Sequence, residues 1–279
     1  WDTSSGALLE KFMAYEAVHP VESWEDLKDR LDLDRRYFAF FHPRMPDEPL
    51  IFLEVALQEG LSDSIQDLLD PSAPVRDPDR ADTAIFYSIS NAQTGLSGIS
   101  FGGFLIKRVV DGLSLELPRL KRFATLSPVP GLMAWLLPRL ETEDLFSPSH
   151  RKRLAKALGV GEIQRHVAGI LQDPGWVRDS DLSEALRVPL LHLAARYLAR
   201  EKRSDGRALD PVAHFHLNNG ARVERLNWTA DVSARGLGQS AGIMVNYVYV
   251  TSRIEANHEA YRARDRVVVS PAVRSLVKG

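Results

Sequence analysis

The spacing of hydrophobic residues changes several times along the chain, and each change predicts a structural element. Residues 8–18 (LLEKFMAYEAV) repeat at helical spacing, and Ser23 can serve as the N-cap of a second short helix. We therefore expect residues 1–32 to be helical. Residues 36–57 contain two β-rich runs around a proline-containing turn, which predicts a β-hairpin. The predicted turn contains Pro43, Pro46, Asp47 and Pro49.

The middle of the chain alternates between short strands and helices. Residues 84–90 (AIFYSIS) form a short apolar run typical of a strand. From about Phe101, apolar residues fall at helical spacing as far as Leu113. Another strand is predicted at 122–127 (RFATLS), and residues 132–205 are expected to form an inserted block of helices.

The last third is expected to return to strands. Three runs read as strands: VAHFHL (212–217), RVERLNW (222–228) and GIMVNYVYV (242–250). Asn218, Asn219 and Gly220 would then form a hairpin turn. The whole pattern predicts an α+β fold, built on a central, mostly antiparallel sheet that is flanked by helices.

The composition indicates the class of protein, but it says little about any reaction that the protein catalyses. The 279 residues are 44% hydrophobic and 26% charged, with a formal net charge of −2. This balance is typical of a globular protein, and it gives little support to nucleic acid as a partner. The chain has no cysteine, which excludes disulfides and thiolate chemistry. No apolar run approaches the ~20 residues of a membrane span. No leader is visible at Trp1, and we expect a cytoplasmic protein that does not associate with a membrane.

A glycine-rich stretch allows three interpretations. Residues 98–102 (GISFG) match the G-x-S-x-G elbow that carries the nucleophile of serine hydrolases, here Ser100. However, the predicted strand ends near Ser90, ten residues too early for an elbow. A glycine-rich loop before a helix can instead hold phosphate through backbone N–H groups and the helix dipole. The third interpretation is a structural turn.

Two further sites combine a possible chemical role with a structural one. Ser127 precedes a proline and an apolar run, so it can cap a helix. His214 and His216 would share one face of the predicted strand 212–217. Metal binding by this H-x-H pair lacks a supporting pattern, and a structural histidine is an alternative. Tyr247 and Tyr249 would share a face of the last strand, with Tyr249 a candidate for substrate contact.

Longer stretches of the chain resemble a known family. They include AIFYSISNAQTGLSGISFGGFLIKRVV (84–110), ATLSPVPGL (124–132) and LDPVAHFHLNNGARVERLNWTADVSARGLGQSAGIMVNY (209–247). Together with EAVHPVESWEDLKDRL (16–31), they resemble the catalytic domain of malonyl-CoA decarboxylase over nearly the whole chain. Because these matches keep one order without a large gap, they are more specific than any short motif above.

The resemblance implies a fold and a ligand. The family's catalytic domain is similar to the Gcn5-related N-acetyltransferase fold, in which acyl-CoA lies where a strand splays from its neighbour. By matched position, the strand 84–90 would lie beside pantetheine and the loop 93–98 would hold the pyrophosphate. The implied substrate and CoA contacts are Ser88, Ser90, Gln93, Thr94, Gly95, Leu96, Ser97, Gly98, Ser100 and Tyr249.

The resemblance also implies an activity. The family splits malonyl-CoA into acetyl-CoA and CO2 without a metal, biotin or another cofactor. Its catalytic serine and histidine match Ser127 and His216 in this chain, where they would stabilise and protonate an enolate. Some relatives carry a glutamate where this chain has Ser100, so a charge-based role at that position is in doubt here.

Assembly and the competing functions are also expectations. The family has a helical domain upstream that takes part in assembly, which this chain lacks, and we expect a homo-oligomer. An acyl-CoA-dependent N-acyltransferase on the same fold is the main alternative activity. A serine hydrolase using Ser100 and an acyl-CoA sensor without turnover are the others.

Overall fold

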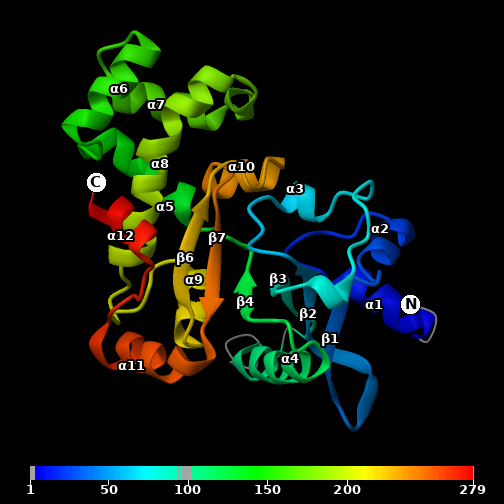
Figure 1. Ribbon diagram of the computed structural model, residues 1–279. Coiled ribbons are helices and arrows are strands. Elements are labelled where there is room, and N and C mark those ends of the chain that lie inside the picture. The colour runs from blue at the N-terminus through cyan, green and yellow to red at the C-terminus, as the bar shows by residue number, and fades with distance from the viewer. Residues whose placement is uncertain (1–3, 94, 96–101, 279) are drawn as a thin grey trace. The chain divides into compact units, whose positions relative to one another are not determined.

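The computed structural model describes residues 4–93, 95 and 102–278 (Figure 1). The chain divides into two compact units, Trp1–Leu126 and Ser127–Gly279. Helices and strands are mixed in each unit, which confirms the predicted α+β class.

The first unit contains a sheet of four strands in the order β1-β2-β3-β4. The pairs β1–β2 and β2–β3 are antiparallel and β3–β4 is parallel. Its strands are β1 (Arg35–His42), β2 (Met45–Gln58), β3 (Thr83–Asn91) and β4 (Arg122–Thr125). Its helices are α1 (Gly6–Tyr15), α2 (Trp24–Asp29), α3 (Ile65–Leu68), η1 (Pro78–Arg80) and α4 (Gly102–Glu116).

The hairpin is confirmed, but its turn is shorter than predicted. Strand β2 starts at Met45, so Pro46, Asp47 and Pro49 lie within it. Phe41 pairs with Pro49 and His42 with Met45, with register shifts at both positions. Proline is tolerated here because irregular pairing at the end of a hairpin leaves backbone sites that need no N–H donor.

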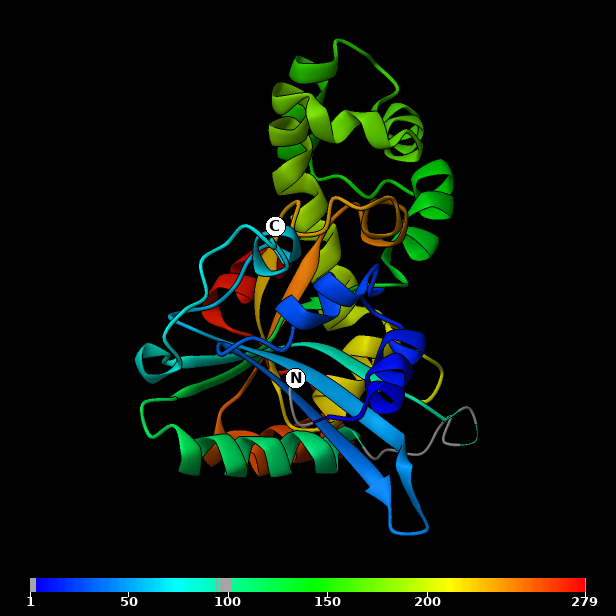
Figure 2. The ribbon, with the colours of Figure 1, turned by 90° about the vertical axis from the view of Figure 1, so that its right-hand side faces the viewer.

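Helices cover both faces of this sheet, as Figure 2 shows. Phe52 of β2 packs with Leu9 and Phe12 of α1 and Leu27 of α2 in one buried cluster. On the opposite face Phe40 of β1 contacts Phe104 of α4, with ring centroids 5.2 Å apart. Successive side chains of a strand point to opposite faces. Because helices cover both faces of the sheet, β2 carries apolar residues on both.

The second unit contains three strands and most of the helices. Strand β7 (Met244–Tyr249) pairs antiparallel with β5 (Ser127–Pro128) and with β6 (Arg222–Asn227). The helices before β6 are α5 (Leu132–Thr142), α6 (Pro148–Leu158), α7 (Ile163–Gln172), η3 (Pro174–Arg178), α8 (Ser180–Arg200) and α9 (Pro211–Asn218). Those after it are α10 (Ala234–Ser240), η4 (Thr251–Arg253), α11 (Ile254–Arg264) and α12 (Pro271–Lys278). Helix α6 lies beside the first part of α8, and α7 packs against α5 (Figure 1).

The prediction of a strand at 212–217 was wrong. These residues belong to helix α9, which begins at Pro211 and has Asp210 as its N-cap. Asn219 is the C-cap of this helix, and Gly220 follows it with φ of +80°, so the expected hairpin turn is also wrong. Glycine adopts such a left-handed φ without the steric cost that a side chain carries.

The predicted cap at Ser127 was wrong as well. Ser127 lies in strand β5, and the next helix, α5, begins at Leu132 with Gly131 as its N-cap. Val129-Pro130 intervenes, and the residue before a proline is disfavoured in helical conformation. The helices α10 to α12 were also missed in the last third of the chain.

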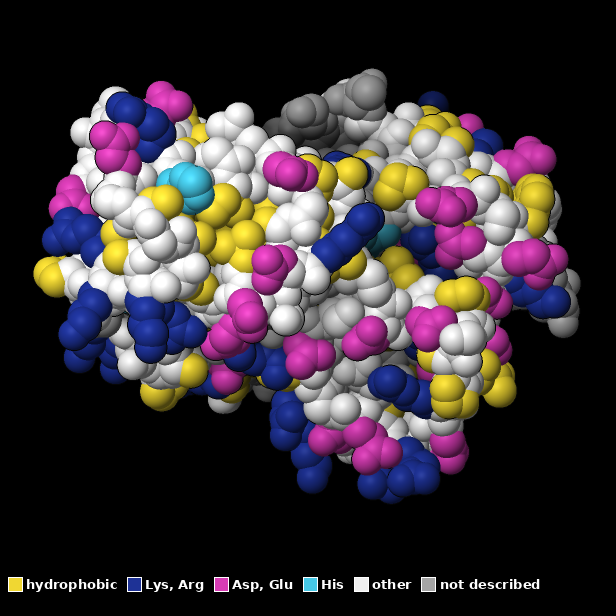
Figure 3. Space-filling view, turned by 90° about the horizontal axis from the view of Figure 1, so that it is seen from above, with side chains coloured by type: hydrophobic (Ala, Val, Ile, Leu, Met, Phe, Trp, Pro, Cys, Tyr) yellow, Lys and Arg dark blue, Asp and Glu magenta, His cyan; other side chains and the backbone are white. Residues whose placement is uncertain are grey.

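The charged surface and the polarity of the helices are those expected from the composition of the chain. On the face shown in Figure 3, basic and acidic side chains lie among one another. Within the described ranges, no helix is both long enough and apolar enough to cross a bilayer.

Candidate active site

Ser127 is held by a very short strand. Its backbone pairs with Val245 of β7, and its side chain is buried, with 5% of the residue exposed. The neighbouring residue Pro128 pairs with Met244. The pairing directs the hydroxyl of Ser127 into the interior of the second unit.

His216 meets Ser127 inside this unit. It lies in the last turn of α9 and is 3% exposed. Its Nε2 atom lies 3.1 Å from Ser127 Oγ, and its Nδ1 atom lies 2.8 Å from the hydroxyl oxygen of Tyr249. Three side chains from β5, α9 and β7 therefore form one continuous chain of hydrogen bonds.

Strand β7 positions the imidazole from two sides. The ring of Tyr247 stacks on the His216 ring, with centroids 4.6 Å apart and an angle of 25° between the planes. Tyr249 meets it edge-on at 6.2 Å. Tyr247 and Tyr249 share a face of the strand with Val245, which pairs with Ser127, because alternate residues point the same way. The expectation that the two tyrosines share a face is confirmed.

Burial sets the charge of this group. It lowers the pKa of His216 to about 3, so the imidazole is neutral at pH 7. Burial also raises the pKa of Tyr249 above its usual value of 10, so this residue stays a neutral phenol. The site is therefore an uncharged hydrogen-bonded chain, in which His216 can donate through one ring nitrogen and accept through the other.

The two histidines of α9 face different partners. His214 Nδ1 lies 2.7 Å from the Tyr261 hydroxyl, whereas His216 contacts Ser127 and Tyr249. Because they do not converge, the H-x-H pair does not form the metal site considered from the sequence. Over the described residues, no group of three or more His, Asp and Glu side chains could hold a metal ion.

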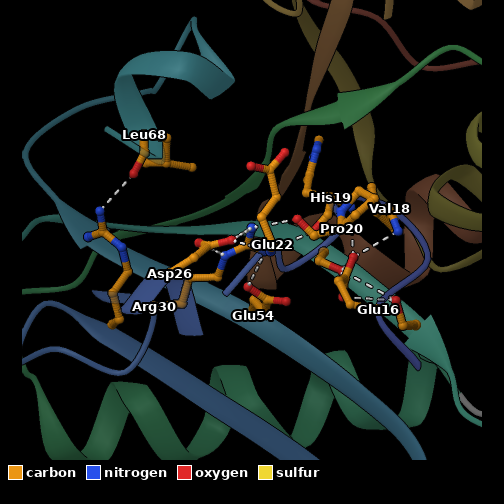
Figure 4. A network of polar contacts seen from close by, with 12 residues as sticks. Glu16, Val18, His19, Pro20, Glu22, Asp26, Arg30, Glu54 and Leu68 are labelled. Atoms are coloured by element: carbon orange, nitrogen blue, oxygen red, sulfur yellow. Dashed lines mark hydrogen bonds and ion pairs between the residues drawn. The ribbon is translucent and has the colours of Figure 1, made fainter. Parts of the chain in front are cut away.

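Ser88 and Ser90, predicted to lie beside pantetheine, contact a buried carboxylate in the first unit. The Ser88 hydroxyl lies 2.8 and 2.7 Å from the two carboxylate oxygens of Glu16, and the Ser90 hydroxyl lies 3.1 Å from one of them. The same carboxylate accepts from the backbone N–H groups of Val18 and His19 (Figure 4). Both serines are buried, and their role toward CoA stays a prediction.

A second buried carboxyl, Glu54, lies in the same network (Figure 4). It is fully buried and 3.6 Å from the Arg30 guanidinium. Burial, together with the nearby Glu16 carboxylate, raises the pKa of Glu54 to about 8. Glu54 therefore carries a proton at neutral pH.

Most of the predicted phosphate loop lies outside the described residues. Gln93 is half-buried, and its side-chain amide donates to the Pro49 carbonyl at 3.1 Å. Gly95 is exposed. Thr94, Leu96, Ser97, Gly98 and Ser100 are outside the described ranges, so their predicted roles are untested. Strand β3 ends at Asn91, and α4 begins at Gly102, which bears out the expected strand and helix on either side of the loop.

Asp210, a structural residue of the site, was not predicted from the sequence. Asp210 is fully buried and caps α9, the helix that carries His216. Asp-Pro at 210–211 is a typical start signal, with an N-cap and proline at the first helical position. This signal was available in the sequence, but the alternation of VAHFHL favoured a strand instead.

Comparison with known proteins shows the family to which this chain belongs. The sequence profile described as "Malonyl-CoA decarboxylase C-terminal domain" matches residues 1–279. This chain belongs to that family. It is 41% identical to the mitochondrial malonyl-CoA decarboxylase of Anser anser anser, over 97% of this chain and 55% of that protein. The chain thus spans about half the length of the curated relatives it matches.

Solved structures support the same family and its fold. The crystal structure of malonyl-CoA decarboxylase from Agrobacterium vitis is 48% identical, with a TM-score of 0.88 over 98% of this chain and 65% of that one. The loading GNATL domain of CurA from Lyngbya majuscula is 11% identical, with a TM-score of 0.50 over 89% of this chain and 94% of that one. The second similarity concerns the fold alone, and it agrees with the expected N-acetyltransferase-like architecture.

Proposed function

We propose that this chain decarboxylates malonyl-CoA to acetyl-CoA and CO2, with Ser127 and His216 as its catalytic pair. The observation that carries the proposal is the buried contact of 3.1 Å between Ser127 Oγ and His216 Nε2, within a member of the malonyl-CoA decarboxylase family. The two residues matched from the sequence meet, although the strand expected at His216 and the helix cap expected at Ser127 were both wrong.

The reaction needs a site that stabilises an enolate. When the bond between C2 and the carboxylate breaks, its electron pair becomes conjugated with the thioester and CO2 leaves. Preorganised donors that face the developing oxyanion are worth about 3 kcal/mol each. A buried, uncharged pocket also favours the loss of a carboxylate as neutral CO2. The hydroxyl of Ser127 and the neutral ring of His216 supply donors of this kind.

The hydrogen-bonded chain also offers a route for the proton that C2 needs. In the tautomer with hydrogen on Nε2, the Ser127 hydroxyl gives its proton to C2 and receives the Nε2 proton of His216. In the same step the Tyr249 hydroxyl gives its proton to Nδ1, so the ring stays neutral. Tyr249 then takes a proton from solvent, and proton exchange between the two ring nitrogens restores the Nε2–H tautomer before the next turnover. The net change is uptake of one proton and release of CO2. His216 thus remains a proton source, acting through Ser127, and it does so without becoming an imidazolium.

Other features of the proposal follow from the family resemblance. Loop 93–98 would hold the pyrophosphate of CoA, and Ser88, Ser90, Ser100 and Tyr249 would contact the substrate. A homo-oligomer, a role in fatty acid metabolism and a cytoplasmic location are likewise proposals. The Anser anser anser relative is named as mitochondrial, so the compartment needs a direct localisation experiment.

One assay separates this function from its alternatives. The 279-residue chain is incubated with malonyl-CoA and no acceptor, and the products are identified by mass. We expect acetyl-CoA and CO2 in equal amounts. Free CoA with malonate would indicate a hydrolase, and unchanged malonyl-CoA would indicate an N-acyltransferase or a sensor. Either of these results would contradict the proposed function.

A further inference from the structure

We propose that Asp210 is a positioning residue that keeps Ser127 and His216 within hydrogen-bond distance, by joining the start of α9 to the loop that follows Ser127. The inference rests on the proposed function, because it assigns a role within the same site. Asp210 itself lies at the opposite end of α9 from His216, and it acts through the backbone.

One oxygen of Asp210 fixes the helix that carries His216. Its Oδ1 atom accepts from the backbone N–H groups of Val212 and Ala213, at 3.0 and 2.9 Å. These bonds cap α9, and they place a negative charge at the positive end of its dipole. The orientation of α9 therefore depends on where this carboxylate is held.

The other oxygen fixes the chain segment that carries Ser127. Asp210 Oδ2 accepts from the backbone N–H of Gly131 at 3.2 Å. Gly131 is the N-cap residue of α5, it lies four residues after Ser127, and no side chain of its own caps that helix. One buried carboxylate thus joins the starts of two helices, and Ser127 and His216 lie on the two segments that it joins.

This connection matters because the strand that carries Ser127 is short. Strand β5 has two residues, and it pairs with β7 only through Ser127 and Pro128. His216 also contacts β7, through Tyr247 and Tyr249. Strand β7 thus holds the pair from one side, and Asp210 holds the two segments together from the other.

Tyr197 of α8 completes the arrangement. Its hydroxyl interacts electrostatically with the Asp210 carboxylate, and its ring packs on Trp135 of α5, with centroids 5.2 Å apart. A side chain at Gly131 would overlap with the Tyr197 hydroxyl oxygen, although the ring carbon that carries this oxygen lies 3.5 Å away, at ordinary contact distance. Glycine is therefore required at 131 as long as the hydroxyl is present.

The first test compares Asp210→Asn with the matched control Asp179→Asn. Asp179 caps α8 through two backbone N–H groups in the same way, but it is exposed. Asparagine is as good an N-cap as aspartate. At 210, however, its amide NH2 must face either Gly131 or the first turn of α9, and both present donors. We expect kcat for malonyl-CoA to fall about 10- to 100-fold, since small misplacements of reacting groups cost this much. KM should change little, and Asp179→Asn should match the parent in both.

The second test uses a double mutant, and it also serves if Asp210→Asn does not fold. Gly131→Ala should lower kcat, because its methyl group displaces the Tyr197 hydroxyl and the loop. Adding Tyr197→Phe removes the clashing oxygen, so the double variant should recover most of the kcat lost by Gly131→Ala. A merely structural defect would instead accumulate in the double variant.

These outcomes separate the inference from the proposed function. If the parent chain releases no CO2 from malonyl-CoA, the proposed function fails. If the parent is active and folded Asp210→Asn keeps parental kcat, the positioning role is wrong. It is equally wrong if Tyr197→Phe fails to restore kcat to Gly131→Ala.

Discussion

The Nε2 atom of His216 lies 3.1 Å from the Oγ atom of Ser127, 89 residues earlier in the chain. Both residues contact β7, Ser127 through its backbone and His216 through the side chains of Tyr247 and Tyr249. The pair is buried and uncharged, so each hydrogen bond in it is stronger than the same bond would be in water.

Removal of the Tyr249 hydroxyl tests the outer end of the hydrogen-bonded chain. In Tyr249→Phe, His216 Nδ1 loses its partner at 2.8 Å, so neither the tautomer nor the proton supply is maintained. We expect kcat to fall about 10- to 100-fold, less than the roughly 100- to 10,000-fold of a direct general acid, because Tyr249 acts through His216. Steady-state kinetics with malonyl-CoA measures this effect.

The other histidine of α9, His214, provides a matched control through its own tyrosine partner. Tyr261→Phe removes a similar hydroxyl, 2.7 Å from His214 Nδ1, but His214 is not part of the proposed pair. This variant should keep parental kcat, even if its melting temperature falls because the hydroxyl also accepts from the Ala208 N–H. Equal losses of kcat in the two variants would argue against a specific role for Tyr249.

The charge state of His216 gives a spectroscopic prediction. Burial lowers the pKa of this ring to about 3, so the ring should stay neutral from pH 8 down to pH 5. In a 15N-histidine NMR titration, the signals lost in His216→Asn should show no imidazolium shift in this range. A shift of these signals with a midpoint near pH 6.5, the ordinary pKa of histidine, would show that the ring becomes charged between pH 8 and pH 5.

The proposed catalytic residues were matched to the family from the sequence, whereas the strand expected at His216 and the helix cap expected at Ser127 were wrong. Residues 212–217 alternate in polarity as a half-buried strand does, but the Asp-Pro start signal begins a helix, and its buried side chains (Ala213, His216 and Leu217) lie on one helical face. A short apolar run fits either structure, so periodicity alone does not decide between them. Ser127 shows the reverse error, because Val129-Pro130 delays the helix that Ser127 was expected to cap.

Contacts between residues that are far apart in the sequence could not be predicted. The hairpin 36–57, the strand 84–90 and the helix that follows Phe101 follow local rules, and they were predicted well. The hydrogen bonds of Ser88 and Ser90 to Glu16 join residues more than 70 positions apart, and no local pattern signals them. The same is true of the link between Asp210 and Gly131.

The buried Glu54 predicts how stability depends on pH. Its pKa is about 8 in the folded chain and 4.5 in the unfolded chain, so between these values the folded state holds a proton that the unfolded state has lost. The free energy of unfolding should therefore fall as pH rises from 4.5 to 8, by up to about 1.4 kcal/mol per pH unit. Glutamine does not titrate. The free energy of unfolding of Glu54→Gln should therefore increase relative to that of the parent as pH rises from 4.5 to 8.

Denaturant unfolding at several pH values measures this difference. Glu59→Gln, at an exposed position in the same unit, serves as the control for the substitution itself. A constant difference for Glu54→Gln would mean that Glu54 does not hold its proton in the folded chain.

The most direct test of the catalytic pair is the rate of acetyl-CoA formation from malonyl-CoA by Ser127→Ala and His216→Asn, beside His214→Asn as the matched control. We expect each of the first two variants to lose about 100- to 10,000-fold in kcat. Their affinity for CoA should change little, and His214→Asn should remain close to the parent. Near-parental kcat in both Ser127→Ala and His216→Asn would show that the two residues are not the catalytic pair.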